Sequence, residues 1–121
     1  MSYVNEEIEV LKHDDFCKEK LHFEGLCIDK YKRIVVRDEN EIELTYTEFE
    51  ILLLLAQNAG IVFSKEQIYE AVFGYDGTAD DTAVTQHIKN IRAKLRTAGV
   101  AAPETVLKTI WGVGYQWKSE T

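Results

Sequence analysis

Two capping-box motifs fix where helices can begin in this 121-residue chain. In such a motif a Ser or Thr hydroxyl accepts a hydrogen bond from the backbone three residues on, and a Glu or Gln there reaches back. Thr45 and Glu48 form the first motif and predict a helix to about Asn58, whose apolar residues cover so much of its circumference that it must be buried on several sides. Ser64 and Gln67 form the second motif and open a shorter helix.

The segments around these helices predict strands and a third helix. Short β-prone runs between residues 21 and 44 (LHFE, LCID, RIVVRD and EIEL) predict three or four antiparallel strands. Asp80 or Asp81 can cap a third helix over residues 81–97. After Pro103, two β-prone runs flank Gly112-Val113-Gly114 and predict a hairpin over residues 106–118. The expected fold class is α+β, with residues 1–20 as a linker or a disordered or marginally helical segment, 21–118 as one domain and 119–121 as a tail.

Composition excludes several classes of protein. With 45% hydrophobic residues the chain is neither a disordered tail nor a fibrous protein. Its longest apolar run, residues 51–56, is far shorter than the roughly 20 residues of a membrane helix. The first ten residues lack a signal-peptide pattern. We therefore expect a cytoplasmic protein with no membrane partner. Two cysteines without a CxxC motif give little support to a disulfide framework.

The charge is unevenly distributed along the chain. A net charge of −7 would ordinarily argue against nucleic acid as a partner. Residues 1–80 carry 8 basic and 18 acidic side chains, a net charge of −10, whereas residues 81–121 carry 6 basic and 3 acidic ones, a net charge of +3. The two ends therefore suit different electrostatic partners.

The third predicted helix is amphipathic, and its polar face lacks carboxylates. At about 100° per residue, one face gathers Val84, Ile88, Ile91 and Leu95, which predicts that this face is buried. The opposite face carries Thr82, Gln86, Lys89, Asn90 and Ala93, with Arg96 toward one edge. Amides of this length can bond adenine, and a lysine can bond guanine or a phosphate, when a helix enters the major groove of DNA.

A second interpretation of this face is a solvated helix surface without a partner. The order of the predicted elements favours DNA binding, because a short helix, a loop and a more basic helix form a helix-turn-helix. The hairpin after them can supply a second contact with DNA.

Three runs carry a close resemblance to a known family. LTYTEFEILLLLAQNAGIVFSKEQIYEAVFG, VTQHIKNIRAKL and LKTIWGVGYQW together resemble the winged helix-turn-helix effector domain of OmpR/PhoB-type response regulators, over about residues 21–118. The resemblance implies a small N-terminal antiparallel sheet, three helices with the third in the major groove, and a C-terminal hairpin, the wing, at the adjacent minor groove.

The resemblance also implies roles for individual residues. It implies base or phosphate contacts from Thr82, Gln86, Lys89 and Asn90 and a phosphate contact from His87. It also implies DNA-backbone contacts from Arg92 and Thr109 and a role beside a flanking phosphate for Phe73. This chain has Thr82 and Thr85 where the family commonly has arginine and aspartate, and Trp111 replaces the usual wing arginine. That last change puts a charge contact in the minor groove in doubt, although an indole can still pack against sugar or backbone.

Several of these residues have a structural interpretation as well. His87 is alternatively a half-buried histidine hydrogen-bonded locally, and Arg92 alternatively braces the helix against an acidic neighbour. Lys94 and Arg96 are expected to be solvated or near phosphates rather than specific readers of bases. Tyr115 and Trp117 are expected in the core behind the wing, since alternating aromatics in a hairpin usually pack.

The loop between the second and third helices is another candidate contact. The family's corresponding loop meets RNA polymerase, which makes Tyr75, Asp76 and Asp80 candidates, although an ordinary solvated loop fits equally well.

The resemblance implies a two-component transcription regulator whose phosphorylated receiver domain drives dimerisation on direct-repeat DNA half-sites. Twenty linker-like residues cannot form a receiver, so the chain is expected to be either an excised effector domain or a regulator that works without phosphorylation. A winged helix that binds protein rather than DNA is the alternative function.

Enzyme chemistry has weak support, because the GxSxG, HExxH and GxxxxGK[ST] motifs are all missing from the sequence. We expect no cofactor and no small-molecule substrate. A zinc site at His13, Cys17, His22 and Cys27 is disfavoured, since zinc ligands usually come in pairs two to four residues apart.

Overall fold

The first layer of the molecule is a four-stranded antiparallel sheet. The computed structural model describes residues 21–23, 25–74 and 81–119, with the backbone alone for residues 21–23. The sheet runs in the order β1 (Leu21–Phe23), β2 (Leu26–Asp29), β3 (Ile34–Arg37) and β4 (Asn40–Ile42). The buried carboxylate of Asp29 accepts the backbone N–H groups of Tyr31 and Lys32 at 2.9 and 3.0 Å and so closes the β2–β3 turn. The predicted strands are confirmed.

Both capping boxes are present and open the two helices predicted from them. Thr45 Oγ1 accepts from the Glu48 N–H at 3.2 Å while Glu48 Oε1 accepts from the Thr45 N–H, and α2 (Tyr46–Gln57) follows. Ser64 and Gln67 exchange the same two bonds ahead of α3 (Lys65–Phe73). The buried residues of α2 occupy one wide face, and Leu53 and Leu54 on its other sides are partly buried against the core, so α2 is the central helix.

The third long helix, α4 (Thr82–Thr97), matches its predicted range, but its predicted cap is wrong. Asp81 has helical backbone angles (φ −74°, ψ −3°) rather than the extended ones of a capping residue, and its side chain makes no capping bond. Asp80, the other candidate cap, lies outside the described residues. Val84, Ile88, Ile91 and Leu95 are buried, as predicted.

The C-terminal hairpin of β6 (Leu107–Ile110) and β7 (Gly114–Trp117) is confirmed, and two small elements join it. Strand β5 (Val62–Phe63) pairs with β7 and gives a second sheet of order β5-β7-β6. The short helix α5 (Pro103–Val106) leads from α4 into the hairpin. Tyr115 and Trp117 are buried in the core behind the hairpin, as expected.

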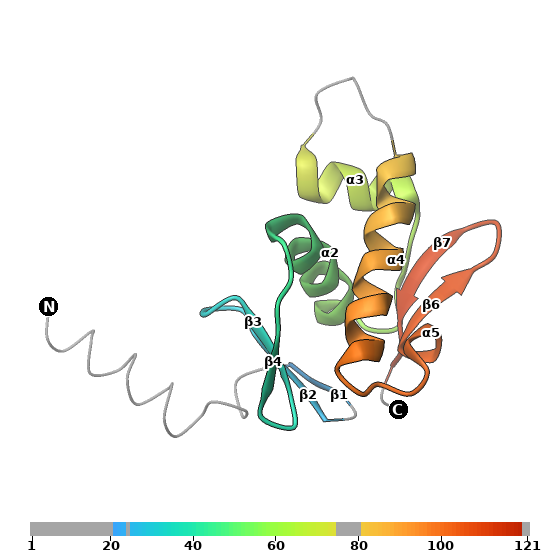
Figure 1. Cartoon of the computed structure of the whole chain (residues 1–121). Coiled ribbons are helices and arrows are strands. Elements are labelled where there is room, and N and C mark those ends of the chain that lie inside the picture. Colours follow the sequence, from blue (N-terminus) through green and yellow to red (C-terminus); the bar gives the residue numbers. More distant parts are fainter. Residues whose placement is uncertain (1–20, 24, 75–80, 120–121) are drawn as a thin grey trace, which may run out of the picture.

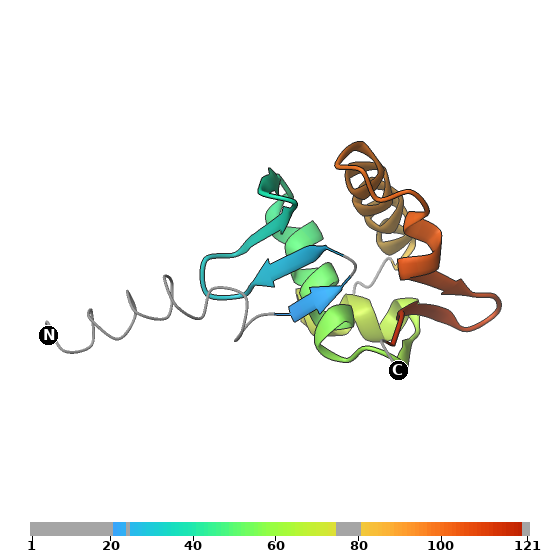
Figure 2. The same cartoon turned by 90° about the horizontal axis from the view of Figure 1, so that it is seen from below.

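The two sheets lie on opposite sides of the helices. In Figures 1 and 2 the N-terminal sheet is at one end of the molecule, α2 is in the middle, and α4 and the β6–β7 hairpin are at the other end. This is the α+β winged helix-turn-helix architecture that the sequence predicts. The predicted linker (1–20) and loop (75–80) lie outside the described residues, and the domain limits 21–118 and 119–121 stay predictions.

Candidate nucleic-acid interface

The outer face of α4 is exposed and contains no carboxylate. Thr82, Gln86, Lys89 and Ala93 are exposed, and Asn90 is half-buried. The Gln86 amide Nε2 donates to Asn90 Oδ1 at 3.0 Å, which orients the two amides along one line of the helix. None of the sixteen residues of α4 is acidic. The sequence-predicted contacts on this helix are thus brought together on one accessible surface, which we call the α4 ridge (Thr82, Gln86, Lys89, Asn90 and Ala93).

Arg92 ties α4 to the wing, the β6–β7 hairpin. Its Nε and Nη2 donate to the Leu107 carbonyl at 3.0 and 2.6 Å, and Nη2 also donates to Thr109 Oγ1 at 2.8 Å. Burial lowers the pKa of the Arg92 guanidinium, an effect opposed by the nearby Tyr115 and Glu104. Arg92 braces the helix, as one interpretation of the sequence predicted, but the prediction of an acidic partner was wrong. Its acceptors are the neutral oxygens of Leu107 and Thr109.

A second contact between helix and wing comes from Tyr115. Its hydroxyl donates to Thr85 Oγ1 at a long 3.5 Å, and its ring lies 5.9 Å from the Arg92 guanidinium carbon. The wing is therefore held in a fixed position relative to the α4 ridge.

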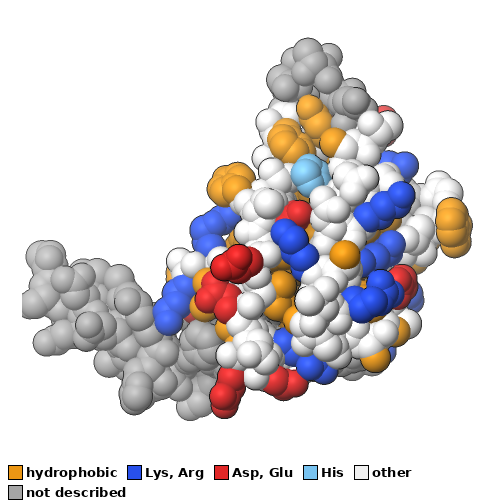
Figure 3. Space-filling view, viewed as in Figure 1, with side chains coloured by type: hydrophobic (Ala, Val, Ile, Leu, Met, Phe, Trp, Pro, Cys, Tyr) orange, Lys and Arg blue, Asp and Glu red, His pale blue; other side chains and the backbone are white. Residues whose placement is uncertain are grey.

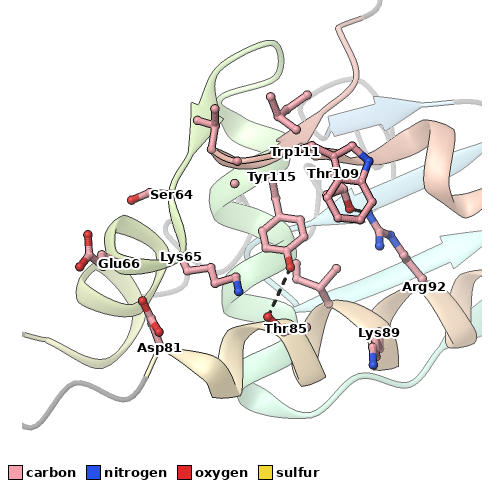
Figure 4. Close-up of a pocket in the computed structure, with 15 residues that line it drawn as sticks. Ser64, Lys65, Glu66, Asp81, Thr85, Lys89, Arg92, Thr109, Trp111 and Tyr115 are labelled. Carbon is pink, nitrogen blue, oxygen red and sulfur yellow. Dashed lines mark hydrogen bonds between the residues drawn. The ribbon is translucent and has the colours of Figure 1, made fainter.

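An open cleft of about 580 Å³ separates α4 from the wing. Lys89 and Arg92 line its helix side, Thr109 and Trp111 line its wing side, and Lys65 at the start of α3 closes one end, as Figure 4 shows. The carboxylates of Glu66 and Asp81 also line the cleft, at the end where Lys65 lies. The other end, with Lys89 and Arg92, carries only cationic charges and suits a strand of phosphates.

The basic residues at the end of α4 are paired with carboxylates. Lys94 forms a 2.6 Å ion pair with the buried Glu48, and Arg96 forms a 2.6 Å ion pair with the exposed Glu104. Burial would raise the pKa of Glu48, but hydrogen bonds from Lys94 and from the Thr45 backbone outweigh it and leave that pKa lowered. Arg96 is exposed to solvent, as expected, and Lys94 is partly exposed; the carboxylate partners of both residues were not predicted.

His87 lies beside the aromatic end of α3. Its ring centre is 6.4 Å from that of Phe73, which in turn stacks on Tyr69 at 4.8 Å. His87 is half-buried, and its buried Nδ1 has no hydrogen-bond partner among the described residues. Phe73 remains 42% exposed and is accessible at the edge of the ridge.

The acidic side chains gather away from most of the α4 ridge. Asp38, Glu39, Glu41 and Glu43 are exposed on the β3–β4 hairpin, and only the last turn of α4 shares a groove with it. Figure 3 shows Lys and Arg side chains along α4 and most of the visible Asp and Glu on the side of the N-terminal sheet. Within the part of the chain that the structure describes, the exposed carboxylates of the N-terminal sheet therefore do not screen the ridge.

Comparison with known proteins decides the family. A family model described as "Transcriptional regulatory protein, C terminal" matches residues 39–117, which spans α2, α3, α4 and the wing. The chain belongs to this family.

Family members with known structures share the fold described above. The DNA-binding domain of CpxR from E. coli is 35% identical, with 84% of this chain and 98% of that one covered and a TM-score of 0.70. The RstA DNA-binding domain of Klebsiella pneumoniae, solved in complex with the RstA box, is 26% identical, with 83% and 97% covered and a TM-score of 0.68. This chain is thus a winged-helix effector domain of the OmpR/PhoB type.

The regulatory protein VanRB of Enterococcus faecalis is 49% identical over 82 residues, which are 68% of this chain and 34% of VanRB. The chain therefore spans about a third of the length of that curated relative.

Most of the remaining candidate residues lie outside the part of the chain that the structure describes. Tyr75, Asp76 and Asp80 lie outside the described residues, as do His13 and Cys17 of the disfavoured zinc set, and Cys27 is buried. Within the described ranges, no helix has the length and apolar character needed to cross a bilayer. Lys65 lines the cleft but was not predicted as a contact. It follows the Ser64 helix cap, and no residue near it in the sequence indicates that it faces α4 and the wing.

Proposed function

We propose that this domain binds double-stranded DNA sequence-specifically, with α4 in the major groove, and so regulates transcription. The exposed, carboxylate-free α4 ridge is the observation that carries the proposal. A major groove about 12 Å wide admits an α-helix, and amide and ammonium groups on the entering face read base edges there. Membership of the transcriptional regulator family supports the same partner.

Each ridge residue has a role within this proposal. Gln86 and Asn90 offer amides to base edges from adjacent turns, and Lys89 offers an ammonium to guanine or phosphate. Thr82 contacts a base or phosphate at the start of the helix. His87 and Phe73 lie together at one edge of the ridge and flank a phosphate.

The wing residues act on the other side of the cleft. Thr109 contacts the DNA backbone from the cleft floor, and Arg92 beside it acts chiefly by positioning the wing through its bonds to β6. Trp111 contacts the duplex at the wing tip.

The proposal extends to partners that the described residues do not include. By resemblance, a receiver domain or a second copy of the chain pairs two domains on direct-repeat half-sites, and the loop with Tyr75, Asp76 and Asp80 meets RNA polymerase. Pairing would raise affinity, because the second binding event becomes effectively intramolecular. Since bacterial DNA lies in the cytoplasm, the proposal places the protein there.

A binding titration at several salt concentrations tests the proposal. Duplexes selected from a random-sequence pool would be fluorescently labelled and titrated with the 121-residue chain between about 50 and 200 mM salt. We expect log K to fall with log salt with a slope of about −0.9 for each phosphate neutralised. No enrichment of any sequence and no binding at low salt would refute the proposal and favour a protein-binding winged helix.

A matched pair of charge variants locates the surface. Lys89→Ala should weaken binding by about 1 to 3 kcal/mol and relax specificity at one base pair, if Lys89 reads a base. Lys30→Ala removes the same charge from the β2–β3 turn, on the N-terminal sheet, and should leave affinity nearly unchanged. Equal effects of the two substitutions would mean that α4 has no special part in binding.

A further inference from the structure

Two amide side chains on the α4 ridge are bonded to each other. Gln86 Nε2 donates a hydrogen bond to Asn90 Oδ1 at 3.0 Å, across the four residues that bring two side chains to the same face of a helix. Hydrogen bonds between amides at this spacing stabilise a helix surface. The bond also breaks the symmetry of the Asn90 amide, because turning that amide by 180° would place its N–H groups against those of Gln86.

The bond leaves Asn90 able to make a bidentate contact. An asparagine amide has two lone pairs on its oxygen and two N–H groups on its nitrogen. Gln86 uses one lone pair, so one lone pair of Oδ1 and both N–H groups of Nδ2 are left for another partner. Ala93, one turn further along the α4 ridge, is exposed and has no long side chain that would keep a partner away.

Adenine is the base that matches an amide held in this way. On its major-groove edge the N7 acceptor lies beside the N6 amino donor, and an asparagine can bond both at once. Guanine presents two acceptors, O6 and N7, at the same edge and therefore cannot donate to the amide oxygen. An amide that rotates freely can form single bonds with several bases, so an amide of fixed orientation discriminates better.

We propose that Gln86 is a positioning residue, which holds the Asn90 amide in the orientation that reads adenine in the major groove. This rests on the DNA binding proposed above and names the base that one part of the α4 ridge selects. The two side chains act as one unit, in which Asn90 contacts the base and Gln86 sets the direction of that contact. Both side chains are uncharged, so their effect is on base preference and not on the salt dependence of binding.

The contact of Asn90 with adenine is tested first. Duplexes selected from a random-sequence pool by the unchanged chain and by Asn90→Ala identify the base pair concerned. We expect the unchanged chain to prefer adenine at one position and Asn90→Ala to lose that preference. Replacing this adenine by 7-deazaadenine, which lacks the N7 acceptor, should weaken binding of the unchanged chain on the order of tenfold. The same replacement should leave the affinity of Asn90→Ala unaltered.

The positioning role of Gln86 is tested at the same base pair. Gln86→Met removes the donor but keeps a side chain of similar length, and we expect the preference for adenine over guanine to fall severalfold with an unchanged salt slope. In the Asn90→Ala background, Gln86→Met should have no further effect at this position, since the two residues act through one contact. Gln86→Glu supplies an acceptor in place of the donor, so the Asn90 amide should turn round and the adenine preference should be lost.

Gln57→Met is the matched control. Gln57 is an exposed amide near the end of α2, away from the α4 ridge, so its loss should change neither affinity nor base preference. Circular dichroism would check that each variant keeps its fold.

The outcomes separate the positioning role from DNA binding itself. An adenine preference that Gln86→Met and Gln86→Glu leave unchanged at the Asn90 position would overturn the inference and leave the proposed function standing. So would a selected site in which no adenine preference depends on Asn90. No binding to any selected duplex would refute the proposed function, and the inference with it.

Discussion

Replacing Arg92 by methionine should destabilise the domain while changing how it binds DNA only indirectly. Arg92 makes three short contacts to two acceptors, the carbonyl of the buried Leu107 and the hydroxyl of Thr109. Hydrogen bonds from a charged donor contribute about 1.5 to 3 kcal/mol each, and desolvation of the half-buried guanidinium offsets part of this. We therefore expect the free energy of unfolding to fall by about 2 to 4 kcal/mol.

Urea unfolding, followed by far-ultraviolet circular dichroism, measures this loss, and the dependence on urea should keep its slope if the wing remains folded. The DNA titration then distinguishes a brace from a phosphate ligand. If Arg92 acts mainly by positioning the wing, Arg92→Met weakens binding with little change in the salt slope. Lys89→Met is the matched control: because Lys89 is exposed, its stability should change by less than about 0.5 kcal/mol, while its salt slope falls by up to about 0.9.

Two results would refute this reasoning. An unfolding free energy of Arg92→Met equal to that of the unchanged chain would mean that the bonds to β6 contribute nothing net. A salt slope of Arg92→Met reduced by about 0.9 would make Arg92 a phosphate ligand rather than a brace.

Two further predictions concern the wing base and α2. Gly114→Ala should destabilise the domain by about 3 kcal/mol or more, because the new Cβ would lie 1.9 Å from the Phe63 carbonyl oxygen. Gly112→Ala should destabilise it by only about 1 to 2 kcal/mol, because Gly112 has a positive φ of 79°. Thermal unfolding would compare the two variants, and equal losses of stability would contradict the close approach at Gly114. Since the pKa of Glu48 is lowered in the fold, its stabilising contribution is complete above the ordinary carboxyl pKa and is lost as the pH falls through the lowered value. Lys94→Met should therefore destabilise most near pH 7 and least near pH 3 in urea titrations, and a pH-independent difference would mean that the ion pair is not the cause.

The sequence predicted those parts of the fold that depend on local chemistry. Thr45 with Glu48, and Ser64 with Gln67, are complete capping motifs in four residues, so both helix starts were predictable. The buried stripe of α4 follows from helical periodicity alone. The α4 ridge was predictable for the same reason, because it is the opposite face of the same helix.

Features that depend on distant residues were not predictable. Strand β5 has two residues and is defined by its pairing with β7, more than fifty residues later. Lys94 lies 46 residues from Glu48, and Arg92 lies 15 and 17 residues from its acceptors, so no local pattern indicates these partners. The Asp81 cap failed because the residue type permits a capping bond but does not enforce the backbone angles that the bond needs.

The most direct test of the central claim is a chemical-shift map of the isotope-labelled chain, titrated with a selected duplex. The account predicts that the largest backbone amide shifts fall on residues 82–93 of α4 and residues 109–113 of the wing, with small shifts over β2, β3 and β4. Shifts concentrated on the N-terminal sheet, with those of α4 unchanged on binding, would contradict the assignment of this helix as the DNA-reading element.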